Sequence, residues 1–417
     1  MKASSRLLLA AVTAVAALSA YAQAPAQEAG SVLRAPPSNP FPPRHACRTP
    51  LTTQREACDA LRRIMNPDWS APEDLILLPH RGYWGFGAVA FVPENSGQGL
   101  ANVRRNRYAA SEVDFMPSLD GLVLSHDYVL TRIADAPPND RRLIYNTPTS
   151  ELTRLHLRDR FGNVTEEELA TSGVLFDGYS LDEMPAIIFA DIKQKEGAGQ
   201  AFADNWVAAL SRILETTPGR HRARLVVKTP YTPDYIRRTL SPAARARMDE
   251  ILWMPQVADD NYYKSVHPGV DGTHVRNSAD FVDVWHRTGL VAAFETNWKL
   301  RHDSRRSPFS RGGTTYANIL DYIRRTTGLR GGVFAEEPVG PRGVVNRHAQ
   351  WHVKDAAADL RGDFFFEAVE PEWGGFMVVT TDRPDIWEEM RRKVWPRRES
   401  EPLAPGTAED FWKESAR

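Results

Sequence analysis

The sequence is poor in cysteine, has almost no net charge and contains only one long apolar run. Its two cysteines, Cys47 and Cys58, have no third soft ligand nearby, which argues against a cysteine-ligated metal site. The formal net charge of −1 leaves no excess of basic side chains for binding nucleic acid. Beyond the N-terminus no segment is apolar enough to cross a bilayer, so we expect no stable membrane anchor.

Several nucleotide and metal motifs are also missing. There is no P-loop and no H-E-x-x-H. The glycines between Gly82 and Gly87 have the wrong spacing for dinucleotide binding. These absences argue against P-loop nucleotide hydrolysis, H-E-x-x-H zinc chemistry and dinucleotide-dependent redox chemistry.

The N-terminus has the pattern of a secretory signal peptide. Lys2 and Arg6 are followed by an apolar run over residues 7–18 and by Ala20-Tyr21-Ala22, so residues 1–22 are predicted to be cleaved after Ala22. The mature chain is then periplasmic or secreted. In an oxidising compartment a Cys47–Cys58 disulfide is favoured, and two free thiols are the alternative.

Composition divides the rest of the chain. Residues 23–45 are rich in proline, alanine and glutamine and are predicted to be a disordered lead-in. Residues 46–73 form an N-terminal segment that carries the expected disulfide. Residues 74–395 are long enough for one large barrel, and residues 396–417 form a C-terminal tail.

Apolar, β-branched runs alternate with helical patterns, which predicts an α/β fold, a (β/α)8 barrel. Most of the runs are continuous rather than alternating, as is typical of strands buried on both faces of a parallel sheet. The nine strand candidates are Leu75–Pro79, Ala110–Phe115, Leu122–Ser125, Ala186–Lys193, Leu225–Thr229, Ile251–Val257, Leu290–Thr296, Gly332–Ala335 and Phe376–Thr381.

Nine candidates for eight positions mean that one is not a barrel strand. Leu290–Thr296 and Gly332–Ala335 compete for the seventh position. Residues 128–180 carry little strand signal and are predicted to be a small insertion after the third strand. Within it, Thr165-x-x-Glu168 reads as a capping box and predicts a helix over Thr165–Thr171.

Polar motifs follow the early strand candidates. Two histidines can share acid and base roles, because the ordinary imidazole pKa lies near neutrality. Two carboxylates of an E-x-D pair lie on one strand face and can chelate a hard cation, and an arginine can fork onto phosphate. The motifs are Pro79-His80-Arg81-Gly82, Pro93-Glu94-Asn95-Ser96, Glu112-Val113-Asp114, Asp120-Gly121, His126-Asp127, Asp191-Ile192-Lys193 and Thr381-Asp382-Arg383-Pro384-Asp385.

In order and spacing these motifs resemble the glycerophosphodiester phosphodiesterase family, with its H-R-G, P-E-N-[ST], E-x-D, D-G, H-D, [ED]-I-K and T-D-R-P-D signatures. The resemblance covers roughly residues 74 to 390. It implies a phospholipase C-like TIM barrel that hydrolyses small-molecule glycerophosphodiesters to glycerol 3-phosphate and an alcohol. It also implies a divalent metal, Ca²⁺ or Mg²⁺.

The resemblance also implies roles for particular residues. His80 and His126 are the expected acid/base pair. Arg81 and Lys193 are expected to bind the substrate phosphate. The metal ligands are expected to be Glu112, Asp114 and Asp191.

Several alternatives stay open for these side chains. Arg81 pairs structurally with a barrel carboxylate in one of them, and Lys193 forms an ion pair with Asp191 alone in another. Asp127 either orients His126 or caps a turn. Glu94 and Asn95 are expected to support the loop rather than take part in the chemistry. Lys228, Glu295 and Glu336 either line the pocket or form ion pairs.

Two other functions compete with the leading one. Asp191 stands where the family more often has glutamate, and sphingomyelinase D-like relatives of this barrel share that change. A phospholipase D or sphingomyelinase D-like enzyme acting on lysophospholipid or sphingomyelin is therefore one alternative. A non-catalytic phosphoester-binding barrel is the other, and the intact motif residues argue against it.

Overall fold

The computed structural model describes residues 52–67, 75–85, 89–173, 176, 183–194, 199–264, 274–296, 307–335, 378–385 and 387–388. The predicted signal peptide, lead-in, Cys47 and C-terminal tail lie outside these residues, as does Glu336. Among the helices of the described ranges, none combines the length and apolarity that a membrane crossing needs.

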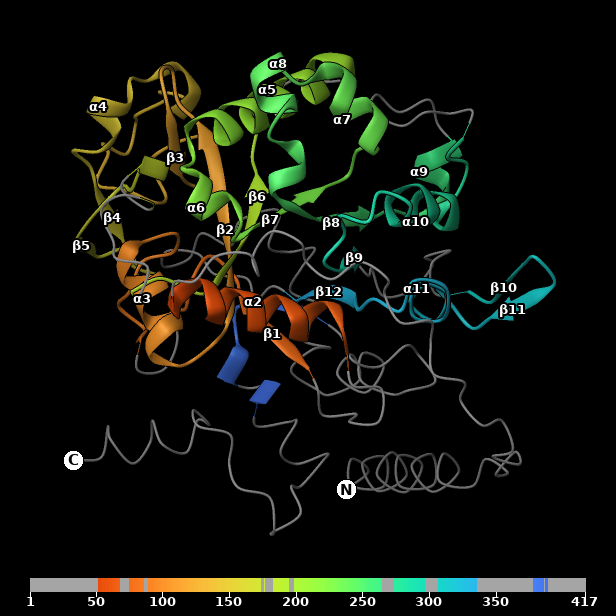
Figure 1. The fold of residues 1–417 in the computed structure, drawn as a ribbon. Coiled ribbons are helices and arrows are strands. Elements are labelled where there is room, and N and C mark those ends of the chain that lie inside the picture. The colour runs from red at the N-terminus through yellow and green to blue at the C-terminus, as the bar shows by residue number, and fades with distance from the viewer. Residues whose placement is uncertain are drawn as a thin grey trace, which may run out of the picture. The chain divides into compact units, whose positions relative to one another are not determined.

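A nine-stranded sheet forms the centre of the fold (Figure 1). Eight of its strands pair in parallel, and only β3 runs antiparallel to its neighbour β2. The order is β1-β13-β12-β9-β8-β7-β6-β2-β3. The strands are β1 (Ile76–Pro79), β2 (Ala110–Pro117), β3 (Leu122–Leu124), β6 (Ile187–Ile192), β7 (Leu225–Thr229), β8 (Leu252–Val257), β9 (Phe294–Thr296), β12 (Gly331–Ala335) and β13 (Val378–Thr381).

The sheet curls until the two ends of its parallel set meet. Gly82, after β1, donates its N–H to the carbonyl of Glu112 on β2 at 3.2 Å. The Ser111 hydroxyl on β2 donates to the carbonyl of Pro79 on β1 at 2.9 Å. Residues at the carboxyl ends of β1 and β2 therefore lie beside each other.

Polar caps begin several of the helices between the strands. In five of them a Ser, Thr or Asn side chain accepts the N–H three residues further on, which satisfies one of the unpaired donors of the first turn: α3 (Gly97–Arg105, cap Ser96), α7 (Pro233–Thr239, cap Thr232), α8 (Pro242–Arg245, cap Ser241), α10 (Ser278–His286, cap Asn277) and α11 (Ile319–Thr327, cap Asn318). The other α-helices are α2 (Thr52–Met65), α4 (Thr149–Leu152), α5 (Gly199–Thr216), α6 (Gly219–Arg222) and α9 (Asp260–Lys264).

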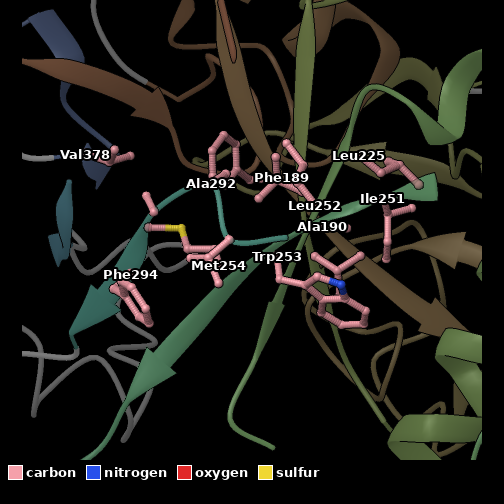
Figure 2. Packing of buried hydrophobic residues seen from close by; sticks show 14 of the residues in the cluster. Phe189, Ala190, Leu225, Ile251, Leu252, Trp253, Met254, Ala292, Phe294 and Val378 are labelled. Atoms are coloured by element: carbon pink, nitrogen blue, oxygen red, sulfur yellow. The ribbon is translucent and has the colours of Figure 1, made fainter. Parts of the chain in front are cut away.

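The main core lies on both faces of the sheet, as the continuous apolar runs predict (Figure 2). Every residue of β1, β7 and β13 is buried. Trp253 on β8 packs against Trp285 of α10, with ring centroids 5.2 Å apart. Cys58 is buried on α2, and since Cys47 lies outside the described residues the disulfide stays a prediction.

The two strand candidates that competed for one position both belong to the parallel sheet. β9 and β12 are paired neighbours. The candidate outside the parallel set is Leu122–Ser125, which forms the antiparallel strand β3. The insertion follows the third strand in chain order, but that strand is a hairpin return from β2 and not a parallel member of the sheet.

The predicted helix over Thr165–Thr171 is wrong. Val164–Glu168 is instead strand β5, paired antiparallel with β4 (His156–Arg158). The Thr165 hydroxyl donates across this hairpin to the carbonyl of Leu157 at 2.9 Å and caps no helix. A second hairpin pairs β10 (Phe309–Arg311) antiparallel with β11 (Thr314–Tyr316).

A second, smaller core lies mainly in residues 128–180, the predicted insertion. Its ten buried side chains are Met116, Val123, Leu130, Ile133, Ala134, Ala136, Ile144, Leu152, Leu157 and Leu169. Met116 and Val123 come from β2 and β3, so this core joins the insertion to the sheet.

Candidate functional site

Strand register brings the polar motifs to one edge of the sheet. Asp114 of β2 is the direct neighbour of Asp191 on β6. His80 and Arg81 follow β1, and Asp382 follows β13, the parallel partner of β1. In α/β folds with a parallel sheet, functional sites gather at the carboxyl ends of the strands.

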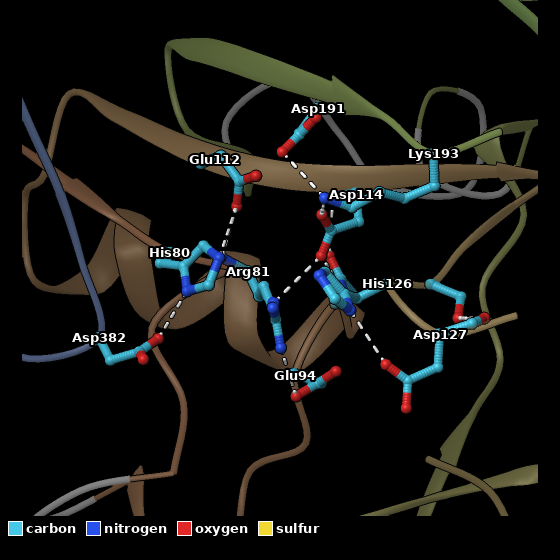
Figure 3. A network of polar contacts seen from close by, with 12 residues as sticks. His80, Arg81, Glu94, Glu112, Asp114, His126, Asp127, Asp191, Lys193 and Asp382 are labelled. Carbon is cyan, nitrogen blue, oxygen red and sulfur yellow. Dashed lines mark hydrogen bonds and ion pairs between the residues drawn. The ribbon is translucent and has the colours of Figure 1, made fainter. Parts of the chain in front are cut away.

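Glu112, Asp114 and Asp191 form one carboxylate cluster. A carboxylate oxygen from each lies within 4.8 Å of the others. Glu112 and Asp114 are fully buried, whereas Asp191 is partly exposed. Lys193 places its Nζ 3.0 Å from Asp114 Oδ1 and 2.9 Å from Asp191 Oδ2 (Figure 3).

The donor set fits a hard divalent cation. Glu112 Oε1 is buried and has no hydrogen-bond partner among the described residues. Three carboxylates offer only oxygen ligands, which Ca²⁺ and Mg²⁺ prefer. Among the described residues that pair in this network, carboxylates outnumber lysine and arginine side chains. The carboxylates are Glu94, Glu112, Asp114, Asp127, Asp191, Glu295 and Asp382, and the basic side chains are Arg81, Arg132, Lys193 and Lys228.

Burial and neighbouring charges act differently on the three carboxyls. Burial, reinforced by the Asp114 carboxylate, raises the pKa of Glu112 well above its usual range. Burial also opposes ionisation of Asp114, but the charges of Lys193 and Arg81 outweigh it and hold its pKa well below the usual range. For Asp191 burial is outweighed by Lys193 and Lys228, so its pKa is lowered. A cation beside Glu112 would favour its charged form.

His80 is held between two carboxylates. Its Nδ1 lies 2.7 Å from Asp382 Oδ1. Because a carboxylate only accepts, the ring donates Nδ1–H to Asp382 and turns Nε2 toward Glu112, whose Oε2 is 3.8 Å away. The Trp84 indole donates to the carbonyl of His80 at 2.9 Å, which fixes the backbone at the same point.

Arg81 and Gly82 adopt left-handed backbone conformations, with φ of +59° and +86°. A Cβ on Gly82 would meet the backbone carbon of Gly99 at 3.1 Å, so this position requires glycine. The turn lets the Arg81 N–H donate to Glu112 Oε2 at 3.0 Å. The Arg81 side chain donates to Glu94 at 3.2 Å and lies 3.2 Å from Asp114 Oδ2.

Asn95 anchors the loop after β1 to the cluster. Its Nδ2 donates to Asp114 Oδ2 at 2.9 Å, and its Oδ1 accepts the Asp114 N–H at 3.0 Å. Asn95 adopts a φ of +52° to do so, at a cost on the order of 1 kcal/mol. These contacts fix the position of Asp114, which agrees with the supporting role expected of Asn95.

His126 lies on the opposite side of Arg81 from His80 (Figure 3). Its side chain is 37% exposed, and its Nδ1 donates to Asp127 Oδ1 at 3.0 Å. Asp127 also accepts hydrogen bonds from Arg132. The geometry matches the alternative in which Asp127 orients His126.

The structure gives contacts at the site to two residues for which the sequence indicated no role. Asp382 partners His80, and Arg132 holds Asp127. The T-D-R-P-D motif carried a signal for Asp382, but no role was drawn from it. Lys228 and Glu295 form a buried ion pair at 2.9 Å, as one alternative had it.

The fold of this chain is similar to those of several solved structures. A glycerophosphoryl diester phosphodiesterase from Parabacteroides distasonis shares 14% identity over 82% of this chain and 94% of its own, with a TM-score of 0.48. A protein assigned as a glycerophosphoryl diester phosphodiesterase, from Silicibacter pomeroyi, shares 14% over 81% and 98%, with a TM-score of 0.50. An Oleispira antarctica phosphodiesterase, solved with the product sn-glycerol-3-phosphate, shares 17% over 75% and 95%, with a TM-score of 0.42.

No protein-family model matches the sequence, and no curated protein sequence matches it. The likeness to the Silicibacter pomeroyi protein shows an α/β fold with a curled, mostly parallel sheet. The Silicibacter pomeroyi protein is assigned to the family that the motifs resemble, so that resemblance is confirmed at the level of the fold.

Proposed function

We propose that this chain is a metal-dependent phosphodiesterase that hydrolyses glycerophosphodiesters to glycerol 3-phosphate and an alcohol. The observation that carries the proposal is the cluster of three carboxylates, two of them fully buried, with His80, His126, Arg81 and Lys193 around it (Figure 3). We also propose that the curled sheet is a (β/α)8 TIM barrel, in which β1 and β2 close the ring of eight parallel strands.

In the proposed reaction the two histidines divide the proton transfers. Water attacks phosphorus directly, or a glycerol hydroxyl attacks first to give a cyclic phosphate that water then opens to glycerol 3-phosphate. In each attack one histidine takes the proton of the attacking oxygen. The bond from phosphorus to the leaving oxygen breaks, and the other histidine gives that oxygen a proton. Asp382 and Asp127 hold the two Nδ1–H groups, which leaves each Nε2 to exchange the proton.

Charged side chains hold the phosphate in this scheme. A divalent cation bound by Glu112, Asp114 and Asp191 would supply charge stabilisation at the phosphate oxygens. Lys193 brings a point charge to the same edge of the cluster. Arg81 presents a guanidinium that the Glu94 carboxylate orients.

A side-by-side assay tests this function. Purified protein is incubated with glycerophosphocholine and with lysophosphatidylcholine, each with excess Mg²⁺ or Ca²⁺ and each with chelator. We expect glycerol 3-phosphate from glycerophosphocholine, and only with metal. Turnover of lysophosphatidylcholine alone would instead support the phospholipase D-like alternative, which the shorter Asp191 favours. No turnover of either would support the binding-protein alternative.

We further propose that the chain is exported and that Cys47 and Cys58 form a disulfide. The support is the charged, apolar and A-x-A order of residues 1–22, with Cys58 on a helix that packs into the core. Mass analysis of protein from the periplasm or medium is expected to show cleavage after Ala22 and a mass two hydrogens lower than that of the reduced chain. Intact residues 1–22 together with free thiols would contradict both proposals.

A further inference from the structure

Arg132 holds two carboxylates at once. It follows Asp127 by five residues, at the start of the insertion. Its Nη2 donates to Asp127 Oδ1 at 3.0 Å while Nε donates to Oδ2. Its Nη1 donates to Glu94 Oε2 at 3.0 Å while Nη2 donates to Oε1. Each contact is a fork, a geometry that a planar guanidinium can form and an ammonium cannot.

Each of these carboxylates holds one residue of the candidate site. Glu94 Oε2 also accepts from Arg81 Nη1 at 3.2 Å. Asp127 Oδ1 also accepts from His126 Nδ1 at 3.0 Å. One guanidinium therefore joins the proposed phosphate-binding arginine to one of the two proposed acid/base histidines.

The charges explain why a cation is needed between the carboxylates. The side chains of Glu94 and Asp127 are only 6% and 17% exposed. Burial opposes their ionisation, but Arg132 outweighs it and the pKa of each carboxyl is lowered. Without Arg132 the two buried carboxylates would repel each other, because like charges in a poorly solvated site disfavour joint ionisation.

The insertion's own core places Arg132. Leu130 and Ile133, on either side of it, are buried in that core. The Ile133 N–H donates to the carbonyl of Leu130 at 3.1 Å, which closes the turn around Arg132. The guanidinium is thus attached to a packed unit and not to a free loop.

We propose that Arg132 is a positioning residue through which the insertion aligns His126, by way of Asp127, and Arg81, by way of Glu94. This inference rests on the proposed function. It makes the folded insertion a part of the reaction machinery, because its core carries the side chain that fixes both groups.

Kinetic variants separate the two branches of this network. Asp127→Asn is expected to lower kcat with little change in KM, and Glu94→Gln to raise KM with little change in kcat. Arg132→Ala is expected to do both, by roughly 10–100-fold in kcat/KM, the usual loss when a group that orients a site residue is removed. Adding Asp127→Asn to Arg132→Ala should lower kcat little further, since coupled residues are not additive.

Arg142→Ala is the matched control. Arg142 lies in the same insertion and also pairs with two carboxylates, Asp140 at 2.8 Å and Glu151 at 3.2 Å, but it is 47% exposed. Its loss should leave kcat and KM unchanged. If Arg132→Ala behaves like Arg142→Ala, or changes only the amount of folded enzyme, the positioning role is wrong. If the alanine variant does not fold, Arg132→Lys provides the same test, because lysine keeps the charge but cannot form the two bidentate contacts. We expect Arg132→Lys to change both kcat and KM.

A crystal structure of the arginine variant gives a readout that needs no turnover. We expect the Arg81–Glu94 and His126–Asp127 contacts both to be displaced. Retention of both contacts unchanged would overturn the inference. A wild-type protein that neither hydrolyses glycerophosphodiesters nor binds glycerol 3-phosphate would refute the proposed function, and the crystal structure of the variant would still decide the role of Arg132.

Discussion

His80→Ala and His126→Ala are each expected to lower kcat by about 10²–10⁴-fold, the usual contribution of general acid–base catalysis. KM should change little, because Arg81, Lys193 and the metal are proposed to bind the phosphate. The rates are measured with glycerophosphocholine in excess metal. His274→Ala, which changes an exposed histidine four residues before α10, is the control and should keep the wild-type kcat.

Two further results distinguish shared acid/base chemistry from two structural histidines. The double variant should be little slower than the slower single variant, since groups that act as a unit are not additive. The bell-shaped pH profile of kcat should lose one limb in each single variant. A His126→Ala enzyme with near-normal kcat and an unchanged pH profile would show that His126 is structural.

Removing the metal is expected to abolish turnover, and Glu112→Gln or Asp114→Asn should reproduce that loss. An amide keeps the shape of the side chain but removes the charge that binds the cation. Metal affinity, measured by calorimetric titration of Mg²⁺ or Ca²⁺, should fall by at least about 100-fold, more than the loss of a mere supporting contact.

Asp249→Asn is the control for these variants, because Asp249 is an exposed carboxylate, 63% accessible, paired with Arg237 at 3.5 Å. It should bind the metal like the wild type. Full turnover in excess chelator, with metal verified to be absent, would refute the metal role. Unchanged affinity in both site variants would place the metal elsewhere.

The sequence indicated which candidate site residues lie close together better than it indicated the secondary structure of residues 128–180. E-x-D spacing places Glu112 and Asp114 on one strand face whatever the rest of the fold does, and the register of β2 with β6 then brings in Asp191. Thr165–Thr171 carries both a capping-box pattern and exposed polar residues. Pairing with β4, which no local pattern predicts, makes Val164–Glu168 a strand.

Long-range partners were the hardest to predict. His80 and Asp382 are 302 residues apart, and only the parallel pairing of β1 with β13 brings them together. Arg132 has no distinctive neighbours in sequence, and its role depends on two carboxylates from different loops. The sequence could not show which of the candidates that became β9 and β12 is the seventh strand, because both are short and apolar. In the structure both are strands, and they pair with each other.

The central claim is that Glu112, Asp114 and Asp191 hold a divalent cation beside the substrate phosphate. A crystal structure of the protein with Ca²⁺ or Mg²⁺ and glycerol 3-phosphate tests it most directly. The account predicts an ion about 2.0–2.6 Å from an oxygen of each carboxylate, with the phosphate in contact with Arg81 or Lys193. The claim would be contradicted if glycerol 3-phosphate bound at full occupancy away from this cluster, no ion lay at Glu112 and Lys193 still bridged Asp114 and Asp191.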